Sequence, residues 1–354
     1  MFTAAIHAAA PHKARMNIFI TWEGYALPNP PLREGRWGTP GSPMFTAAEY
    51  ATIVRITGEA VLEKGNEGMK LVTYRHKGVE RIGAVRDEAI VDLSDVASSM
   101  LELIAGGPEL LARARTVAAR AEIAVPFKAV SLLAPIPRPR KNIICLGMNY
   151  AAHAIETLRA RGRPEKLPEY PVFFSKALTA VNHPGAVVPL MPEVSAQRDW
   201  EVELAVVIGA GGRNIPRERA LNHVFGYTIL NDVSARDLQA RHQQFFYSKS
   251  LDGAAPMGPW IVTADEIPNP HNLRIRLRLN GVTMQDSNTG DMIFDIPTCI
   301  ATFSTGITLE PGDIFATGTP SGVGMGMNPQ RWLQAGDVME CEIERIGVLR
   351  NEVW

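Results

Sequence analysis

Short β-type runs dominate the sequence from Pro171 to the C-terminus. They are VFFSKAL, VELAVVIG, FGYTILNDV, WIVTA, LRIRLRLNG, DIFATG and VMECEIERIG, and each is bounded by Gly, Pro, Asn or Asp. LRIRLRLNG alternates apolar and charged residues, which predicts a strand with one solvated face. So many short strands with few helices favour a β-rich α+β fold, a sandwich or roll of sheets, over a doubly wound parallel sheet.

The chain divides by pattern into four segments. Residues 1–68 contain the stretch ALPNPPLREGRWGTPGSP and two copies of MFTAA, so we interpret them as an irregular N-terminal extension. Residues 69–133 combine three short alternating stretches with two helical patterns, which predicts a small N-terminal domain. The prolines of residues 134–140, APIPRPR, indicate a linker. A second domain is expected over residues 141–354.

The beginning of the second domain has a strand pattern followed by a helix pattern. KNIICLG is typical of a buried strand, and MNYAAHAIETLRARG is rich in residues that favour a helix. The following text is highly charged and carries two prolines. Residues 157–170 are therefore predicted to form a mobile surface loop or lid.

Composition narrows the classes of partner. The chain has 354 residues, 46% of them hydrophobic and 21% charged, with a formal net charge of -1 and no basic tract. This is typical of a soluble globular protein with a small-molecule partner, not of a nucleic-acid binder. No apolar run approaches the roughly 20 residues of a membrane span, so a cytoplasmic location is expected. The three cysteines are far apart, and we expect reduced, packed thiols.

Three acidic residues fall at strand-like positions. Glu201 and Glu203 in DWEVELAVVIG are two residues apart, so on a strand they share one face. Asp232 follows the strand pattern FGYTILN. Carboxylates converging from two strand ends are typical ligands of Mg²⁺ or Mn²⁺, and a metal ion would relieve their repulsion. The alternative is a solvated strand face with two ordinary surface acids.

His153 and Glu156 lie three residues apart in NYAAHAIE and share a face if that segment is helical. A histidine oriented by a carboxylate is suited to act as a general base toward water. An ordinary surface pair is the alternative.

Several residues are candidates for holding a substrate anion. Lys249, in FFYSKSLDG, is suited to pairing with a carboxylate, stabilising an oxyanion or forming a Schiff base, whereas a surface lysine is the alternative. Arg236 and Gln239 in SARDLQ would donate to a carboxylate or else serve an internal salt bridge. The glycine spacing of ATGTPSGVGMGMN is not that of a phosphate loop. It predicts a turn that presents the Thr319 hydroxyl and backbone N–H groups to an anion.

These motifs together resemble the fumarylacetoacetate hydrolase family. They occur in order as GMNYAAHAIE, PVFFSKAL, DWEVELAVVIG, GYTILNDVSARDLQ, KSLDGAAPMGPW, MQDSNTGDMIF, LEPGDIFATGTPSGVG and LQAGDVMECEIERIG. The resemblance covers residues 141–354, and residues 69–133 look like the small N-terminal domain of bacterial members. It implies a mixed β-sandwich roll, usually a homodimer, with one divalent cation.

The resemblance also implies roles for individual residues. Metal ligands would be Glu201, Glu203 and Asp232, with His153, Glu156 and Lys249 as catalytic residues and Tyr150, Arg236, Gln239 and Thr319 as substrate-binding residues. Some relatives have a further acidic ligand beside the tyrosine. Here that neighbour is Asn149, so three protein ligands and water are expected.

The activity implied is divalent-metal-dependent cleavage of a C–C bond, by hydrolysis or decarboxylation, in a 2-oxo or 2,4-dioxo acid such as an acylpyruvate, fumarylpyruvate or oxaloacetate. One alternative is an isomerase or hydratase of unsaturated 2-oxo-diacids in aromatic catabolism, of the 2-hydroxyhepta-2,4-diene-1,7-dioate isomerase type. Others are a Schiff-base aldolase using Lys249 and a catalytically silent ligand-binding protein.

Overall fold

The computed structural model describes residues 68–122 and 124–354. The chain separates into two compact units, Met1–Glu67 and Gly68–Trp354, and the description below concerns the second. The predicted N-terminal extension lies outside the described residues except for Gly68.

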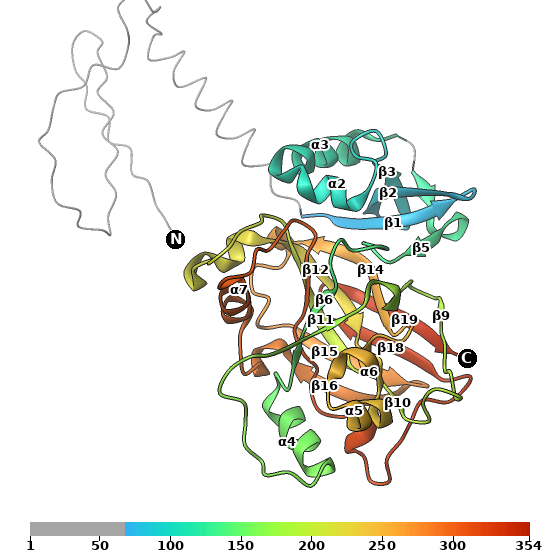
Figure 1. The fold of residues 1–354 in the computed structure, drawn as a ribbon. Helices are drawn as coiled ribbons and strands as arrows, with labels where there is room; N and C mark the ends of the chain where they lie inside the picture. Colours follow the sequence, from blue (N-terminus) through green and yellow to red (C-terminus); the bar gives the residue numbers. More distant parts are fainter. Residues whose placement is uncertain (1–67, 123) are drawn as a thin grey trace, which may run out of the picture. The chain divides into compact units, whose positions relative to one another are not determined.

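Within the described residues, a large mixed sheet runs through the whole second unit (Figure 1). Its strands in spatial order are β4 (Val125–Pro126), β3 (Ala89–Asp92), β2 (Val79–Arg86), β1 (Lys70–His76), β14 (Ala255–Thr263), β12 (Val224–Asn231), β11 (Val202–Ile208), β17 (Ile314–Ala316), β6 (Ile143–Gly147) and β7 (Val172–Lys176). Two further strands join it, β5 (Ser131–Leu133) at β1 and β8 (Val181–Asn182) at β14. Every residue of β11 and β12 is buried, as expected of strands covered on both faces.

A second sheet packs against β11, β12 and β14. Its order is β16 (Val282–Asn288), β15 (Arg274–Leu279), β18 (Val338–Ile343), β19 (Gly347–Val353) and β9 (Val187–Val188). The three arginines of β15 lie on its outer face and pair with acids of β16 and β18, while its isoleucine and leucines are buried. The predicted solvated face is therefore confirmed, as is the β-rich α+β fold with a sandwich of sheets.

Short helices and connections complete the second unit. The α-helices are α2 (Met100–Ala105), α3 (Gly107–Arg120), α4 (Ala151–Ala160), α5 (Arg236–His242), α6 (Phe245–Lys249) and α7 (Ile296–Ser304). A two-residue pairing joins β10 (Arg198–Asp199) to β13 (Ser234–Ala235). The 3-10 helices are η1 (Phe127–Ala129), η2 (Leu178–Ala180), η3 (Arg217–His223), η4 (Ala264–Glu266), η5 (Thr289–Asp291) and η6 (Gly324–Gly326).

The predicted loop over residues 157–170 begins later than expected. Residues 157–160 belong to α4, and the Thr157 side chain is buried. The helix continues because Leu158, Arg159 and Ala160 all favour it, and the first proline comes only at Pro164. The connection without regular structure therefore starts after α4.

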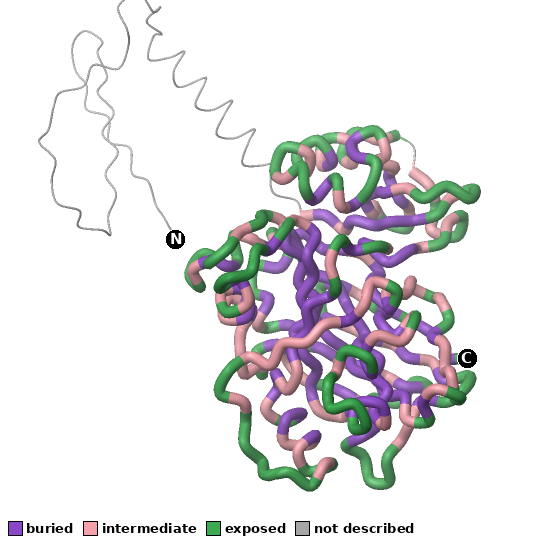
Figure 2. The backbone as a smooth tube through the Cα atoms, in the orientation of Figure 1, coloured by how far each residue is buried: buried purple, intermediate pink, exposed green. Residues whose placement is uncertain are grey.

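The predicted linker is packed into a core. Residues 134–140 have no regular secondary structure, yet Ala134 and Ile136 are buried in the same cluster as Leu71 of β1 and Ile143 of β6. Figure 2 shows buried residues throughout the interior of the second unit, whereas Arg138 and Arg140 of this segment are exposed. Residues on both sides of the segment thus share one core, and the division into domains stays a prediction.

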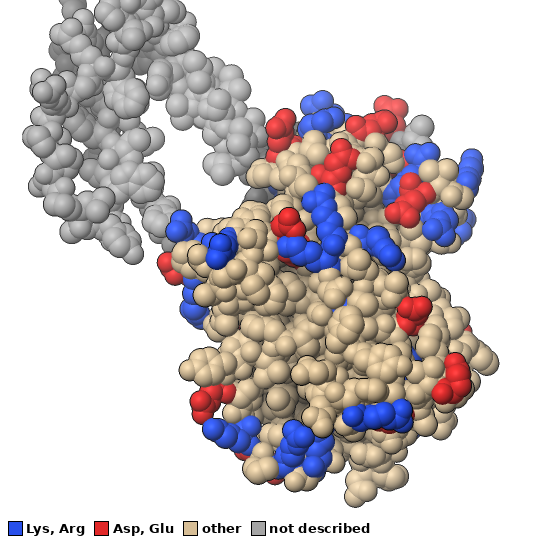
Figure 3. Space-filling model, viewed as in Figure 1, with Lys and Arg blue, Asp and Glu red and all other residues tan. Residues whose placement is uncertain are grey.

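On the face shown in Figure 3, basic and acidic side chains are interspersed among large areas of other residues. This face therefore carries no large patch of one charge. Among the described helices, none combines the length and apolarity needed to cross a bilayer. The three cysteines are free and buried, which confirms packed thiols.

Candidate functional site

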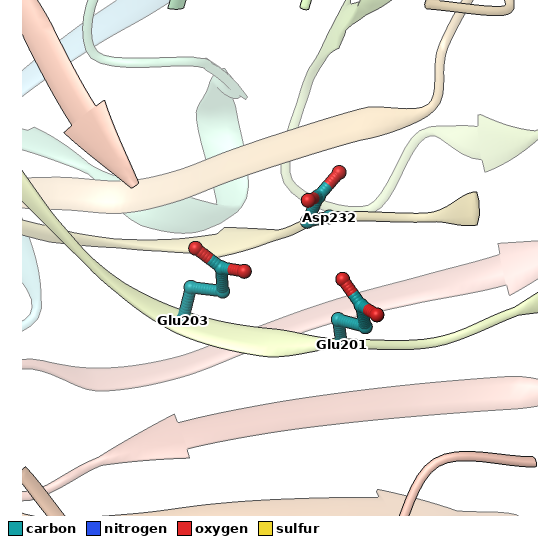
Figure 4. A group of neighbouring side chains, drawn as sticks. All are labelled: Glu201, Glu203 and Asp232. Carbon is teal, nitrogen blue, oxygen red and sulfur yellow. The ribbon is translucent and has the colours of Figure 1, made fainter. Parts of the chain in front are cut away.

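Strand register brings the three predicted acids together. β11 and β12 are antiparallel, with Val202 opposite Asn231 and Glu203 opposite Leu230. One residue further, Glu201 lies opposite Asp232, and the Asp232 N–H donates to the Glu201 carbonyl at 2.8 Å. Opposed residues share a face, and Glu203 returns to that face two residues on. The three side chains project to the same side of these strands (Figure 4), and one oxygen of each lies within 4.8 Å of the others.

These carboxylates are buried, not spread over a solvated strand face. The residues are 4% exposed for Glu201, 1% for Glu203 and 0% for Asp232. The alternative of ordinary surface acids is therefore wrong. Buried carboxylates carry a large desolvation cost unless cations and hydrogen bonds compensate them.

Basic side chains compensate two of the three carboxylates. Lys249 Nζ lies 2.5 Å from Glu201 Oε2 and 2.6 Å from Asp232 Oδ2. Lys176 Nζ lies 2.6 Å from Asp232 Oδ1, and Arg236 Nη2 lies 2.6 Å from Glu201 Oε1. Every oxygen of these two carboxylates thus has a cationic donor.

The same contacts decide between the alternative roles that the sequence left open for Arg236 and Lys249. Arg236 also donates from Nε to Asp199 at 2.8 Å, so it does form the internal salt bridge that the sequence left open. Lys249 is 3% exposed, which excludes a surface lysine. Burial alone would lower its pKa, but Asp232 and Glu201 raise it above the ordinary value, so the amine stays charged.

Glu203 differs from the other two acids in its partners. Its Oε2 accepts from the Gly318 N–H at 2.8 Å, and no basic side chain within residues 68–122 and 124–354 forms an ion pair with it. Burial, Asp232 and Glu201 raise its pKa well above the usual range. Burial also opposes ionisation of Glu201, but Arg236 and Lys249 outweigh it and lower that pKa. Of the three acids, Glu203 is therefore the one without a cationic partner in the described part of the chain.

His153 and Glu156 lie beside the acids on one face of α4. His153 Nδ1 is 3.4 Å from Glu156 Oε2, and its Nε2 is 3.9 Å from Glu201 Oε1. Glu156 is fixed in turn by the Gly322 N–H, at 3.1 Å from its Oε1. The pair is an oriented, largely buried dyad and not an ordinary surface pair.

The glycine-rich turn binds anions, but they are carboxylates of the protein itself. Besides the bonds to Glu203 and Glu156, the Gly324 N–H donates to Asp199 Oδ1 at 2.7 Å. The Thr319 hydroxyl donates to the Val202 carbonyl and accepts from Gln285, both at 2.8 Å. The expectation that this turn presents its N–H groups to an external anion is therefore wrong for these three groups, because the turn closes against the acid-bearing strands.

A pocket of about 410 Å³, including its open mouth, brings most of the candidates together. Its wall includes the candidates His153, Glu201, Glu203, Arg236, Gln239, Lys249 and Thr319, together with Arg161, Thr157, Phe174 and Phe245. Tyr150 is not part of this wall: it is 1% exposed, and its hydroxyl has no partner among the described residues.

Asn149 is occupied by the backbone. Its Nδ2 donates to the carbonyls of Thr317 and Phe294, and its Oδ1 accepts from the Phe294 N–H. Its amide therefore supports the turn beside the acids and adds no fourth acidic group.

Sequence reasoning missed three charged residues of this site. Lys176, Asp199 and Arg161 lie in or beside it, through contacts with Asp232, Arg236 and Gln239 respectively. The available signal for Lys176 was a lysine at the end of the apolar run PVFF, where a strand would bury it. Nothing in the sequence indicated that Arg161 is part of the site, because it lies in a charged stretch typical of a protein surface.

Lys176 offers a stability test of this charge network. Lys176→Met is expected to destabilise the protein by about 3–5 kcal/mol, because it leaves a buried Asp232 oxygen without its ammonium partner. The measurement is chemical denaturation of the protein without added metal. Lys166→Met is the control, because Lys166 is 77% exposed and its ion pair with Glu169 is worth at most about 1 kcal/mol. Equal losses in both variants would contradict the role of Lys176.

Comparison with known proteins gives consistent matches over the described unit. The family described as fumarylacetoacetate (FAA) hydrolase C-terminal matches residues 142–354. Oxaloacetate tautomerase YisK of Bacillus subtilis is 46% identical over 275 residues, which are 75% of this chain and 90% of that protein.

Solved structures match the fold as well. Fumarylacetoacetate hydrolase from Exiguobacterium antarcticum has a TM-score of 0.69 at 40% identity, covering 80% of this chain and 99% of that one. Maleylpyruvate hydrolase from Sphingobium sp. SYK-6, in complex with manganese (II) ion and pyruvate, has a TM-score of 0.66 at 32% identity, covering 80% and 98%. These three proteins are named as enzymes, and residues 142–354, which the family matches, contain the acids, the dyad and Lys249.

Proposed function

The chain belongs to the fumarylacetoacetate hydrolase family, and from this premise we propose that it is a divalent-metal-dependent tautomerase that interconverts the keto and enol forms of a 2-oxo diacid of the oxaloacetate type. The observation that carries the proposal is the buried group of Glu201, Glu203 and Asp232 beside Lys249 and the His153–Glu156 dyad. The 46% identity to an oxaloacetate tautomerase supports this choice of reaction.

The residues fit a hard divalent cation. An all-oxygen donor set of three carboxylates is typical of Mg²⁺ or Mn²⁺. Glu203 is buried without a cationic partner in the described part of the chain, so a bound cation would supply its missing charge. Glu201 and Asp232 already accept from basic side chains, but each ionised carboxylate has about four lone-pair sites and can serve both. When bound, the cation would supply Lewis-acid polarisation of the 2-oxo group.

The chain's own residues would move the proton and hold the charge. In the enol-to-keto direction the enol O–H bond breaks and its proton passes to His153 Nε2, which then releases a proton to C3. A C–H bond forms there as the C2–C3 double bond becomes the C2–O double bond, and His153 returns to its starting state. We assign the proton at C3 to His153 Nε2, because Glu156 orients the ring through Nδ1. The Lys249 ammonium lines the same pocket and would stabilise negative charge that develops on the 2-oxo oxygen.

Cleavage of a C–C bond is the second candidate, and one observation favours it. Glu156 is held by both His153 and the Gly322 N–H, an arrangement suited to orienting a base that activates water. The same stabilisation of an enolate would serve hydrolysis of a dioxo acid or loss of CO₂ from oxaloacetate. Isomerisation of an unsaturated 2-oxo-diacid would use the same proton transfer.

The geometry disfavours a Schiff-base aldolase. A Schiff base requires a neutral amine, whereas Lys249 Nζ contacts two carboxylates at 2.5 and 2.6 Å. Borohydride treatment in the presence of a 2-oxo acid is therefore expected to leave Lys249 unlabelled. Homodimer formation and a cytoplasmic location stay predictions.

A paired assay separates the two leading reactions. We expect the enzyme with Mn²⁺ or Mg²⁺ to accelerate loss of the ultraviolet absorbance of enol-oxaloacetate, with much slower release of pyruvate. Parallel assays with acylpyruvates and fumarylpyruvate test hydrolysis. Pyruvate release as fast as loss of the enol would reassign the enzyme to C–C cleavage, and no acceleration of either process would reject both reactions.

A further inference from the structure

Among the residues that the structure describes, Arg161 is the basic side chain of the pocket wall that forms no ion pair with an acid. Arg236 pairs with Asp199 and Glu201, and Lys249 pairs with Glu201 and Asp232. Within residues 68–122 and 124–354, no carboxylate lies within ion-pair distance of Arg161. The pocket wall therefore carries one guanidinium whose charge is not matched.

A single neutral oxygen separates Arg161 from Arg236. Arg161 Nη2 donates to Gln239 Oε1 at 2.5 Å, and Arg236 Nη1 approaches the same oxygen at 3.5 Å. Two guanidinium groups thus converge on an amide that carries no net charge. Burial, Arg236 and Arg163 all lower the pKa of Arg161, and Glu201 only partly opposes them. Such a surrounding favours binding of an anion.

The position of Arg161 separates it from the acids. The Arg236 guanidinium donates to Glu201 from Nη2 and approaches Gln239 with Nη1. Arg161, at the C-terminal end of α4, contacts Gln239 from there. The Arg161 guanidinium lies over the ring of Phe245, which is also part of the pocket wall. The Arg161 Cζ is 6.0 Å from the centroid of that ring. The Gln239 side chain therefore lies between Arg161 and the residues that would bind the reacting end of a substrate.

We propose that Arg161 is a specificity-determining residue that binds the distal carboxylate of a dicarboxylic substrate. The inference rests on the proposed function for the class of substrate, a 2-oxo diacid. A diacid would supply the anion that Arg161 and Gln239 lack, whereas a monoacid of the same chain length would leave the guanidinium unmatched. Arg161 follows the helix that carries His153 and Glu156, so binding of the distal carboxylate would also hold the dyad over the acids.

The plainer explanation is that Arg161 only stabilises the end of α4. It is the C-cap residue of that helix, and a cation at a helix C-terminus is favourable by itself. That role would change the stability of the protein but would not distinguish a diacid from a monoacid. The two explanations therefore differ in ligand selectivity.

Binding of malate and lactate tests this difference without catalysis. The two 2-hydroxy acids share a carboxylate and a neighbouring oxygen, and only malate carries a distal carboxylate. Calorimetry with Mg²⁺ present is expected to give wild-type affinity for malate at least about tenfold above that for lactate, since a hydrogen bond to a charged group has about this effect. Arg161→Gln is expected to remove most of that ratio, mainly by weakening malate.

Two variants complete the test. Arg161→Lys keeps the charge but not the planar fork, so it should retain part of the preference for malate. Arg163→Gln removes a charge two residues away that is exposed and absent from the pocket wall, so the ratio should stay at the wild-type value. Thermal melting of each variant verifies folding and isolates any effect on the helix end.

Three results would overturn the inference: no wild-type preference for malate, an unchanged ratio in Arg161→Gln, or an equal fall in Arg163→Gln. Failure of the proposed function looks different. In that case wild-type and Arg161→Gln keep the expected binding ratios while neither accelerates tautomerisation of oxaloacetate.

Discussion

Glu203→Gln is expected to weaken binding of Mn²⁺ at least about 100-fold. Loss of a partner outside the ligand shell already costs roughly 10–100-fold in metal affinity, and here a ligand itself would be lost. Glu203 is also the acid for which no basic side chain compensates within the described residues. Calorimetric titration of metal-stripped protein with Mn²⁺ measures the affinity directly.

Thermal melting provides an independent readout of the same change. Mn²⁺ at about 100 times its dissociation constant should stabilise the wild-type protein by about 2.7 kcal/mol, and Glu203→Gln should lose that gain. Glu310→Gln is the control, since Glu310 is a half-exposed acid paired with Lys141 and absent from the pocket wall. Wild-type affinity in Glu203→Gln would remove Glu203 from the proposed ligands.

Lys249→Met is expected to separate metal binding from turnover. The variant should bind Mn²⁺ as tightly as the wild type or more tightly, because the ammonium contacts two of the proposed ligands and competes for them. Turnover should fall about 100- to 1000-fold, as when a donor to a developing oxyanion is removed. Rates measured at saturating Mn²⁺ test this.

The metal-free Lys249→Met protein should also lose about 3–5 kcal/mol of stability, because two buried carboxylates lose their shared partner. Added Mn²⁺ should restore part of this loss by replacing the missing charge. Near wild-type turnover in Lys249→Met would contradict the role of the ammonium. Loss of metal binding together with turnover would indicate that Lys249 maintains the site as a whole.

The architecture was largely predictable because its signals are local. β15 alternates charged and apolar residues along its length, and Gly106 caps the end of α2 while Gly107 and Pro108 begin α3. The C-terminal end of α4 was predicted too early, because a charged helix end and a charged surface loop have similar amino-acid compositions. The pairing of β1 with β14 had no sequence signal, since it joins residues that lie far apart in the chain.

The site was predictable where chemistry depends on spacing. Two glutamates two residues apart, and an aspartate at the end of the next strand, meet through a register that both strand patterns permit. The positions of the basic residues that the sequence did not indicate depend on tertiary packing instead. Lys176 and Arg161 come from a different strand and the end of a helix, and their relation to Asp232 and Gln239 is set only when those elements pack.

The most direct measurement is the rate of keto–enol interconversion of oxaloacetate by chelator-stripped wild-type protein, before and after Mn²⁺ is returned. Glu203→Gln is assayed in parallel under the same conditions. We expect the stripped protein to lose its acceleration, Mn²⁺ to restore it, and the variant to stay inactive at Mn²⁺ concentrations that saturate the wild type. A full rate in the stripped wild-type protein would contradict a metal-dependent reaction at these three carboxylates.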